Sequence, residues 1–305
     1  MAVRTRPAAG ATYPVSLVGS DAGAADPASR VQGIIFFIIG LAAYSAVFPL
    51  INSGVIDLAW WISGDAEPLA VYQEQAQAFA RPIGLVAAHL GLASLVLVVW
   101  LLYRFLHHRP LVWLWSVMPG VRWRYALVCL LVALPVFAVA VGLSLGSDPA
   151  WQLPDQWGWY LAAIVLTAPL QALGEEVLFR GYLLQALGTV VRQPWFAIVG
   201  SAALFAAYHG TQNLWLFASR FAFGLLAGLL VWRTGGLEAG VVAHVVNNLA
   251  AFCLALFTGQ LSGVRTVSAL GWSEGLRDLL VFAAFALGAW LVARAMRVPW
   301  RAGGE

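Results

Sequence analysis

An acidic pair followed by an arginine stands inside a largely apolar stretch of the chain. The segment reads EEVLFRG at 175–181, so Glu176 and Arg180 are four residues apart. On an α-helix this spacing puts two side chains on one face, where they can form an ion pair. Glu175 is rotated by about 100° from Glu176 and projects from a different sector. The pattern predicts that Glu176 and Arg180 support the structure and that Glu175 is free for chemistry; the simpler alternative is an ion pair at a solvated helix end.

Two histidines and an asparagine occur in two further apolar segments. His209 closes the segment FAAYH (205–209) just before Gly210, and alone it would be interpreted as a helix C-cap. His244 and Asn248 stand one turn apart in HVVNN (244–248), where the simpler interpretation is a hydrogen bond between helices. The three segments together are more specific than any one of them.

One glutamate, two histidines and one asparagine are sufficient for peptide hydrolysis. A carboxylate can take a proton from water, and an imidazole can orient that water or protonate the leaving amine. His and Asn side chains can donate hydrogen bonds to an oxyanion. The same set also fits a His₂Glu zinc site with an open fourth position, for which Glu175, His209 and His244 are the candidate ligands. The zinc-protease helix signature H-E-x-x-H is absent from the sequence.

The elements that hold these residues are predicted to be membrane-spanning helices. Hydrophobic residues make up 61% of the 305 residues and charged residues 10%, and the mean hydropathy is +0.81. Soluble domains carry about 25% charged residues. An ionisable group inside a bilayer costs about 2.5–3.5 kcal/mol on the insertion scale, so an intramembrane Glu or His is a functional candidate by default.

Apolar segments of about 20 residues, long enough to cross a bilayer, define the predicted fold. It is an all-α membrane protein, a bundle of about eight transmembrane helices, with seven or eight open because two segments are short or interrupted. The segments are 31–56, 83–106, 124–146, 158–174, 194–210, 217–233, 236–258 and 276–296. A helical stretch at 175–192 continues the fourth and is expected to be a bent extension.

The distribution of arginine predicts the orientation. With eight spans, the loop at 104–124, which holds four arginines, falls on the same side as both ends of the chain, whereas the loop at 147–157 has none. The positive-inside rule then puts both termini in the cytoplasm of a multi-pass protein of the cell membrane. The net charge of +3 is too small and too scattered to indicate nucleic acid binding. Residues 1–30 are expected to be a disordered cytoplasmic tail before a polytopic membrane domain at 31–300.

In this order and at this spacing, the motifs EEVLFRG, FAAYH and HVVNN resemble those of the CPBP family, which includes the type II CAAX prenyl endopeptidases and bacteriocin-processing homologues. The family pattern is E-E-x-x-x-R, F-x-x-x-H and H-x-x-x-N, and every motif position is present. The resemblance covers about 158–255 as a catalytic core. It implies an intramembrane endopeptidase that acts on a membrane-associated peptide or protein.

The resemblance also implies roles for single residues. Glu175 would activate water together with His209, and His244 and Asn248 would stabilise the oxyanion. Glu176 and Arg180 would support the site. The family is described both as a metalloprotease, with Zn as the metal, and as a metal-independent glutamate protease, and both versions stay open.

Two other function classes compete with a protease. One is a non-catalytic membrane scaffold or bacteriocin-immunity protein of the same fold, for which a free Glu175 beside His209 would be unnecessary. The other is a transporter, since membrane Glu and His residues are also typical of proton carriers. Transporters usually have paired halves with matching broken helices, and no internal repeat is visible in this sequence.

Overall fold

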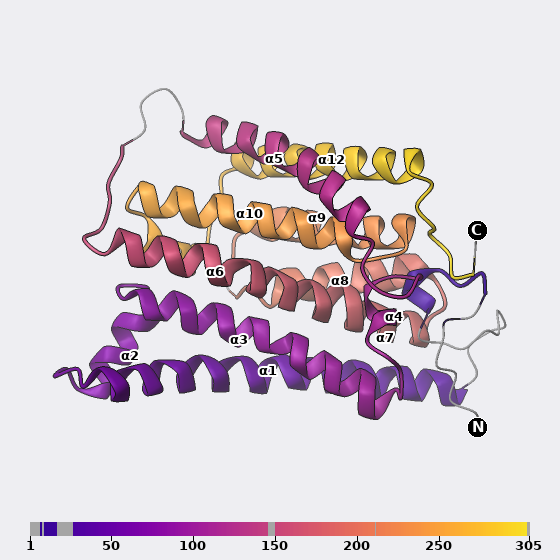
Figure 1. Ribbon diagram of the computed structural model, residues 1–305, viewed down its shortest axis with the longest axis horizontal. Helices are drawn as coiled ribbons and strands as arrows, with labels where there is room; N and C mark the ends of the chain where they lie inside the picture. Colours follow the sequence, from indigo (N-terminus) through magenta and orange to yellow (C-terminus); the bar gives the residue numbers. More distant parts are fainter. Residues whose placement is uncertain (1–6, 8, 17–26, 146–149, 211, 304–305) are drawn as a thin grey trace.

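A helical bundle accounts for nearly all of the described chain. The structure, a computed structural model, describes residues 7, 9–16, 27–145, 150–210 and 212–303. Within these residues there are no strands beyond isolated bridges, and seven helices are long and apolar enough to cross a membrane. The helices lie side by side along one axis (Figure 1). The predicted all-α membrane bundle is confirmed.

Each of the eight predicted segments corresponds to one helix. The long ones are α1 (Pro27–Ser63), α3 (Pro82–Leu101), α5 (Trp123–Leu145), α6 (Trp157–Glu176), α9 (Leu214–Thr234), α10 (Glu238–Phe257) and α12 (Trp272–Ala295), and the short apolar one is α8 (Pro194–Ala207). With 14 residues, α8 spans only about 21 Å, less than the bilayer core of about 30 Å. The described chain therefore has seven full-length spans and one partial span.

Shorter elements extend or connect these helices. A π-helical turn, η2 (Leu102–Leu106), lengthens α3, and a second one, η3 (Val177–Leu183), joins α6 to α7 (Leu184–Val190). The connectors are η1 (Tyr13–Val15), α2 (Leu69–Gln77), α4 (Val112–Trp115) and α11 (Leu261–Thr266). The predicted extension at 175–192 is confirmed, and it begins at the acidic pair. Single π-helical turns inside α-helices are frequent at functional sites.

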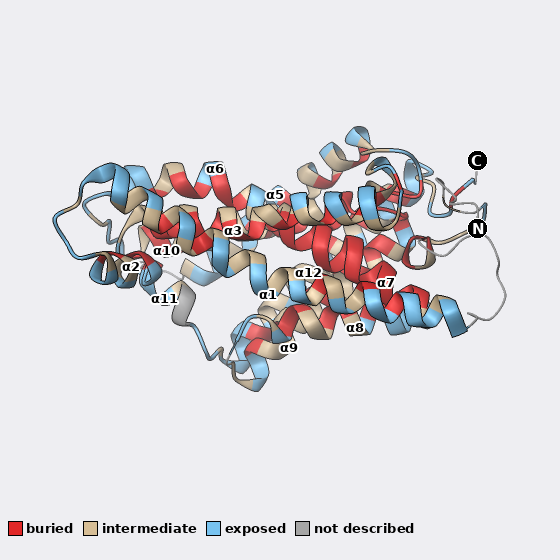
Figure 2. Ribbon diagram, turned by 90° about the horizontal axis from the view of Figure 1, so that it is seen from below, coloured by how far each residue is buried: buried red, intermediate tan, exposed pale blue. Residues whose placement is uncertain are grey.

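The outer surface of the bundle is apolar, as a protein in lipid requires. On α5, the side chains of Leu127, Leu131 and Leu134 are 59%, 67% and 52% exposed and recur at helical spacing. Figure 2 shows buried residues on the inward faces of the helices and exposed ones along their outer faces. Patches of this size on a water-soluble monomer would be unusual, so they support burial in a bilayer.

The described segments near the two ends of the chain, 9–16 and 299–303, lie at one end of the bundle (Figure 1). There the segments near the two ends of the chain pair: Gly10 N donates to Ala302 O at 2.6 Å, and Ala302 N donates to Ala11 O at 2.9 Å. Tyr13 is fully buried, and its hydroxyl donates to Leu114 O. The predicted disordered tail at 1–30 is therefore wrong for residues 9–16, where Tyr13 packs among the helix ends, and for residues 27–30, which are the first residues of α1. Residues 1–6, 8 and 17–26 of that predicted tail lie outside the described residues.

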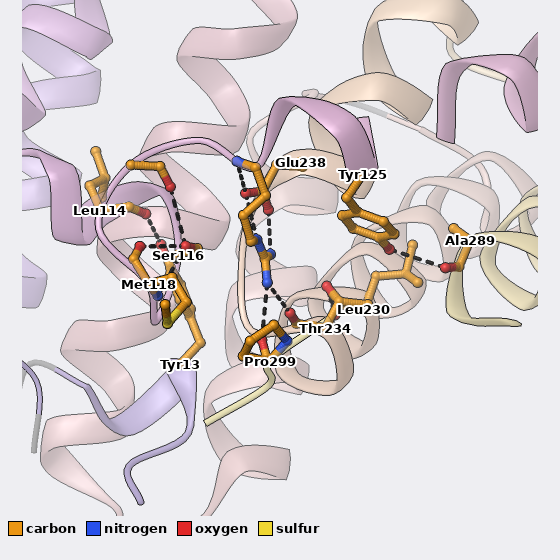
Figure 3. Close-up of polar contacts among 12 residues, drawn as sticks. Tyr13, Leu114, Ser116, Met118, Tyr125, Leu230, Thr234, Glu238, Ala289 and Pro299 are labelled. Carbon is orange, nitrogen blue, oxygen red and sulfur yellow. Dashed lines mark hydrogen bonds and ion pairs between the residues drawn. The ribbon is translucent and has the colours of Figure 1, made fainter. Parts of the chain in front are cut away.

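At the same end of the bundle, Arg122 binds Glu238, Thr234 and Pro299, a group that we call the Arg122 clamp; Figure 3 labels these three partners. Arg122 donates from Nε to Glu238 Oε1 at 2.8 Å and from Nη2 to Glu238 Oε2 at 2.5 Å. Its Nη1 donates to Thr234 O at 2.6 Å and to Pro299 O at 3.0 Å. One guanidinium thus joins the end of α9, the start of α10 and the segment after α12. The segment 111–122 forms the short helix α4 and the loop that carries this arginine.

Candidate active site

Glu176 and Arg180 form a fully buried ion pair. Arg180 Nη1 lies 2.8 Å from Glu176 Oε1, and neither side chain has any exposed surface. The guanidinium also stacks over the ring of Phe205, with its carbon 4.0 Å from the ring centre. The predicted contact between residues four apart on one helix is confirmed. A buried pair of this kind holds its charges in place, because removing one partner would leave the other charge uncompensated.

His244 of α10 connects the two carboxylates. Its Nδ1 lies 2.8 Å from Glu176 Oε1, and its Nε2 lies 3.4 Å from Glu175 Oε2. Since Glu176 is paired with Arg180, its oxygen accepts from Nδ1–H, which leaves Nε2 facing Glu175. The backbone of α10 lies close to Glu176 at Gly240. A Cβ atom at this position would lie only 3.0 Å from Glu176 Oε2, so the absence of a side chain permits the approach. Glu175 projects away from this ion pair: within the described part of the chain its side chain contacts His244 and Gln171 and forms no ion pair with Arg180.

Gln171 is a site residue that the sequence interpretation missed. Its Nε2 donates to Glu175 Oε2 at 3.1 Å, and its Oε1 accepts from Asn248 Nδ2 at 3.3 Å. One amide therefore joins the candidate catalytic carboxylate on α6 to the asparagine on α10. The available signal was its position one turn before Glu175 on the same helix face, inside an apolar segment.

His209 reaches the same region from the end of α8. Its Nδ1 donates to Phe205 O at 2.6 Å, the bond expected of a histidine that caps a helix end. The carbonyl fixes Nδ1 as the protonated nitrogen and leaves Nε2 as an acceptor when the ring is neutral. The imidazole in contact with Glu175 is that of His244. The resemblance implies that His209 activates water together with Glu175, and that role stays a prediction.

One cavity of about 420 Å³ brings the predicted residues together. Glu175, His209, His244 and Asn248 all contribute to its wall. The three motif segments thus meet at one cavity, with side chains from α6, the end of α8 and α10. The cavity continues between helices to Ser144, Leu254 and Val264, near the end of the bundle opposite the termini. It has the size and the mixed lining of a ligand site.

Three further polar groups of the cavity wall come from helices that carry no recognised motif. Ser219 and Arg220 lie on α9, and Asp278 lies on α12. Ser219 Oγ donates to Asp278 Oδ2 at 3.1 Å. No sequence pattern connects these positions, because they meet only through the packing of α9 against α12.

The candidate zinc ligands do not form a three-donor set. Among the residues that the structure describes, no group of three His, Cys, Asp or Glu side chains is placed to hold a metal ion. His244 has one ring nitrogen on Glu176 and the other near Glu175, and the Nδ1 of His209 is on a backbone carbonyl. Both histidines donate from Nδ1, which also leaves Nε2 as the nitrogen that would bind a metal, so the zinc site stays a prediction.

Comparison with known proteins agrees with this site. Residues 157–250 match the model of the family described as type II CAAX prenyl endopeptidase Rce1-like, and the matched segment contains all three motifs. The chain is also 27% identical over 163 residues to the uncharacterized protein YyaK of Bacillus subtilis (strain 168). That alignment covers 50% of this chain and 54% of YyaK, so the chain spans about half the length of this relative. The resemblance inferred from the three motifs is confirmed over the matched segment.

Proposed function

We propose that this multi-pass membrane protein is an intramembrane endopeptidase that hydrolyses a peptide bond of a membrane-associated peptide or protein. The observation that carries the proposal is the convergence of Glu175, His209, His244 and Asn248 on one cavity within the bundle. The match of residues 157–250 to the Rce1-like family supports the same reaction class. We further propose that the chain lies in the cell membrane with both termini in the cytoplasm, because the Arg-rich loop meets the termini at one end of the bundle.

In the proposed reaction, Glu175 acts as the general base. Its carboxylate takes a proton from a water in the cavity, and the water oxygen forms a bond to the carbonyl carbon of the substrate. The C–N bond then breaks, and the proton passes to the leaving amine. Gln171 donates to Glu175 Oε2 and so holds the carboxylate in one orientation.

We assign stabilisation of the oxyanion to N–H donors in the wall of the same cavity. Asn248 Nδ2 donates to Gln171 Oε1 at 3.3 Å, a long bond that an oxyanion can replace. His244 donates from Nδ1 to Glu176, so it can offer Nε2–H to the oxyanion only when it carries a second proton. His209 lies on the same wall with Nε2 as the nitrogen available for proton transfer. We propose a metal-independent route, since the donors form no three-ligand cluster among the described residues.

Purified protein in liposomes tests the proposal. Wild-type protein should cut a hydrophobic peptide at defined bonds, identified by mass spectrometry of the products, and Glu175→Ala should abolish the cleavage without loss of folded protein. Full activity in Glu175→Ala would end the proposal. Binding of peptides without cleavage by the wild type would instead favour a non-catalytic binding protein of the same fold.

A further inference from the structure

Arg220 is a cation in the wall of the catalytic cavity without a counter-charge in contact. It lies two turns into α9 and lines the same cavity as Glu175. Among the described residues, no carboxylate oxygen comes within 4.0 Å of its guanidinium. Four other arginines among the described residues do have such a partner: Arg81, Arg122, Arg180 and Arg277. Arg220 is therefore positioned by something other than an ion pair.

A neutral amide holds one arm of the guanidinium. Arg220 Nη1 donates to Gln212 Oε1 at 2.9 Å, and Gln212 Nε2 donates to Ala206 O at 2.5 Å. Gln212 is thus fixed on the end of α8 and orients the guanidinium without neutralising it. A guanidinium has five N–H donors in a planar fork, so donors remain for a group inside the cavity.

The acidic residue on the neighbouring helix does not serve as the partner. Asp278 accepts from Ser219 at 3.1 Å and has Arg277 Nε at 3.9 Å. Ser219 and Arg220 are successive residues, so their side chains leave α9 about 100° apart. The cavity consequently has separate negative and positive positions in its wall. Leaving a cation unpaired in a low-dielectric site is costly, and an incoming anion would offset that cost.

We propose that Arg220 binds a carboxylate of the substrate and so selects acidic peptides for cleavage. Arginine binds carboxylates through two parallel N–H···O bonds, and the carboxylate can be the C-terminal one or that of an Asp or Glu side chain. The inference rests on the proposed protease function, because it assigns the substrate of that same cavity. Glu175 remains the group that acts on water, and Arg220 sets which peptide is held beside it.

Three peptides of one hydrophobic sequence test this inference. The first ends in a free carboxylate, the second ends in an amide, and the third ends in an amide but has a Glu side chain near its end. Wild-type kcat/KM should be higher for the first or the third peptide than for the second, which also identifies the source of the carboxylate. A charged hydrogen bond of ordinary strength corresponds to a preference of roughly ten- to a hundredfold.

Arg220→Gln should remove that preference, because kcat/KM should fall much more for the acidic peptide than for the neutral amide. Arg220→Lys should keep part of it, because the charge remains but the planar fork is lost. Arg233→Gln is the matched control, since Arg233 is exposed at the other end of α9 and stacks on Trp232. An equal loss on all three peptides, as expected of an oxyanion donor, or no preference in the wild type would overturn the inference.

A binding measurement separates this inference from the protease proposal. Glu175→Gln protein should bind the acidic peptide more tightly than the neutral one, and the double variant with Arg220→Gln should bind both equally. Selective binding without cleavage by wild-type protein would refute the protease function and keep the carboxylate site. Cleavage without any preference for acidic peptides would do the reverse.

Discussion

Two glutamate–arginine ion pairs in this bundle, Glu238–Arg122 and Glu176–Arg180, differ in their surroundings. In the Arg122 clamp, both oxygens of Glu238 accept from one guanidinium, and the remaining donors reach two backbone carbonyls (Figure 3). In the central cluster, Arg180 contacts one oxygen of Glu176, and the same oxygen accepts from His244. Among the described residues, Glu176 Oε2 and Arg180 Nη2 have no hydrogen-bond partner.

The difference lies in what stands next to each pair. The clamp joins three helix ends and contributes no residue to the cavity wall, whereas the central pair lies beside a second carboxylate that does line the cavity. The Glu176–Arg180 pair fixes His244, and His244 in turn contacts Glu175. We therefore propose that both ion pairs are structural and that the additional acid, Glu175, marks the site.

The largest expected effect on stability comes from Glu176→Gln. The substitution leaves Arg180 buried without a counter-charge, which typically costs about 3–5 kcal/mol. Unfolding in mixed detergent micelles should show a loss of this size, together with lower expression. A Glu176→Gln protein as stable as the wild type would break the comparison, because the central pair would then not be structural.

A smaller loss is expected when the clamp is cut with Glu238→Gln. Arg122 is 15% exposed and keeps its two backbone carbonyl acceptors, so the cost should be about 1.5–3 kcal/mol, the value of a charged hydrogen bond. Peptide cleavage per folded molecule should stay at the wild-type level. A selective loss of turnover in folded Glu238→Gln protein would show that the clamp has a catalytic role and would remove the contrast.

Gln171→Leu should affect turnover more than stability. The variant loses one hydrogen bond to Glu175 and one to Asn248, each worth about 0.5–1.5 kcal/mol, so kcat should fall by roughly tenfold. A decrease in kcat with little change in thermal unfolding would sharpen the distinction between the site and its support. Unchanged kcat would mean that Gln171 does not orient the carboxylate.

The sequence was sufficient for the helices and for one contact of the site. Apolar segments of spanning length located every long helix, and the four-residue spacing predicted the Glu176–Arg180 pair. The contacts of His244 with both carboxylates depend on how α10 packs against α6. No local sequence pattern predicts that packing. Gln171 was not predicted because a single amide in an apolar helix is ambiguous. The packing of Tyr13 was not predicted because the Ala- and Gly-rich segment around it contains no apolar run of helical length.

The smallest expected effect concerns the loop after α1, outside the spans. The amide of Glu67 and the guanidinium of Arg81 hold the pKa of Asp65 below its ordinary value. A depressed pKa contributes stability that is present above the pKa of the unfolded chain, about 3.9, and is lost as the pH falls through the folded value. Asp65→Asn should therefore lower the unfolding temperature slightly at pH 7, and the difference from wild type should shrink as the pH falls below about 4 and vanish below the folded pKa of Asp65.

Salt provides the control for that loop. The Arg81–Asp65 pair is partly exposed, with side chains 27% and 22% accessible, so added salt should reduce the effect of Asp65→Asn at pH 7. The same salt should leave the loss caused by Glu176→Gln unchanged, because that pair is fully buried. Equal salt sensitivity of both variants would mean that the central pair is reached by solvent.

The central claim is that Glu175 performs the chemistry and that Glu176 only supports it. It is tested most directly by measuring peptide cleavage and thermal unfolding together for Glu175→Gln, beside wild type with and without a metal chelator. We predict that Glu175→Gln keeps the wild-type unfolding temperature and loses turnover by roughly 100- to 10,000-fold, the contribution of a general base, and that the chelator leaves wild-type turnover unchanged. A Glu175→Gln protein that is destabilised but still cleaves at the wild-type rate per folded molecule would contradict the assignment of the two carboxylates.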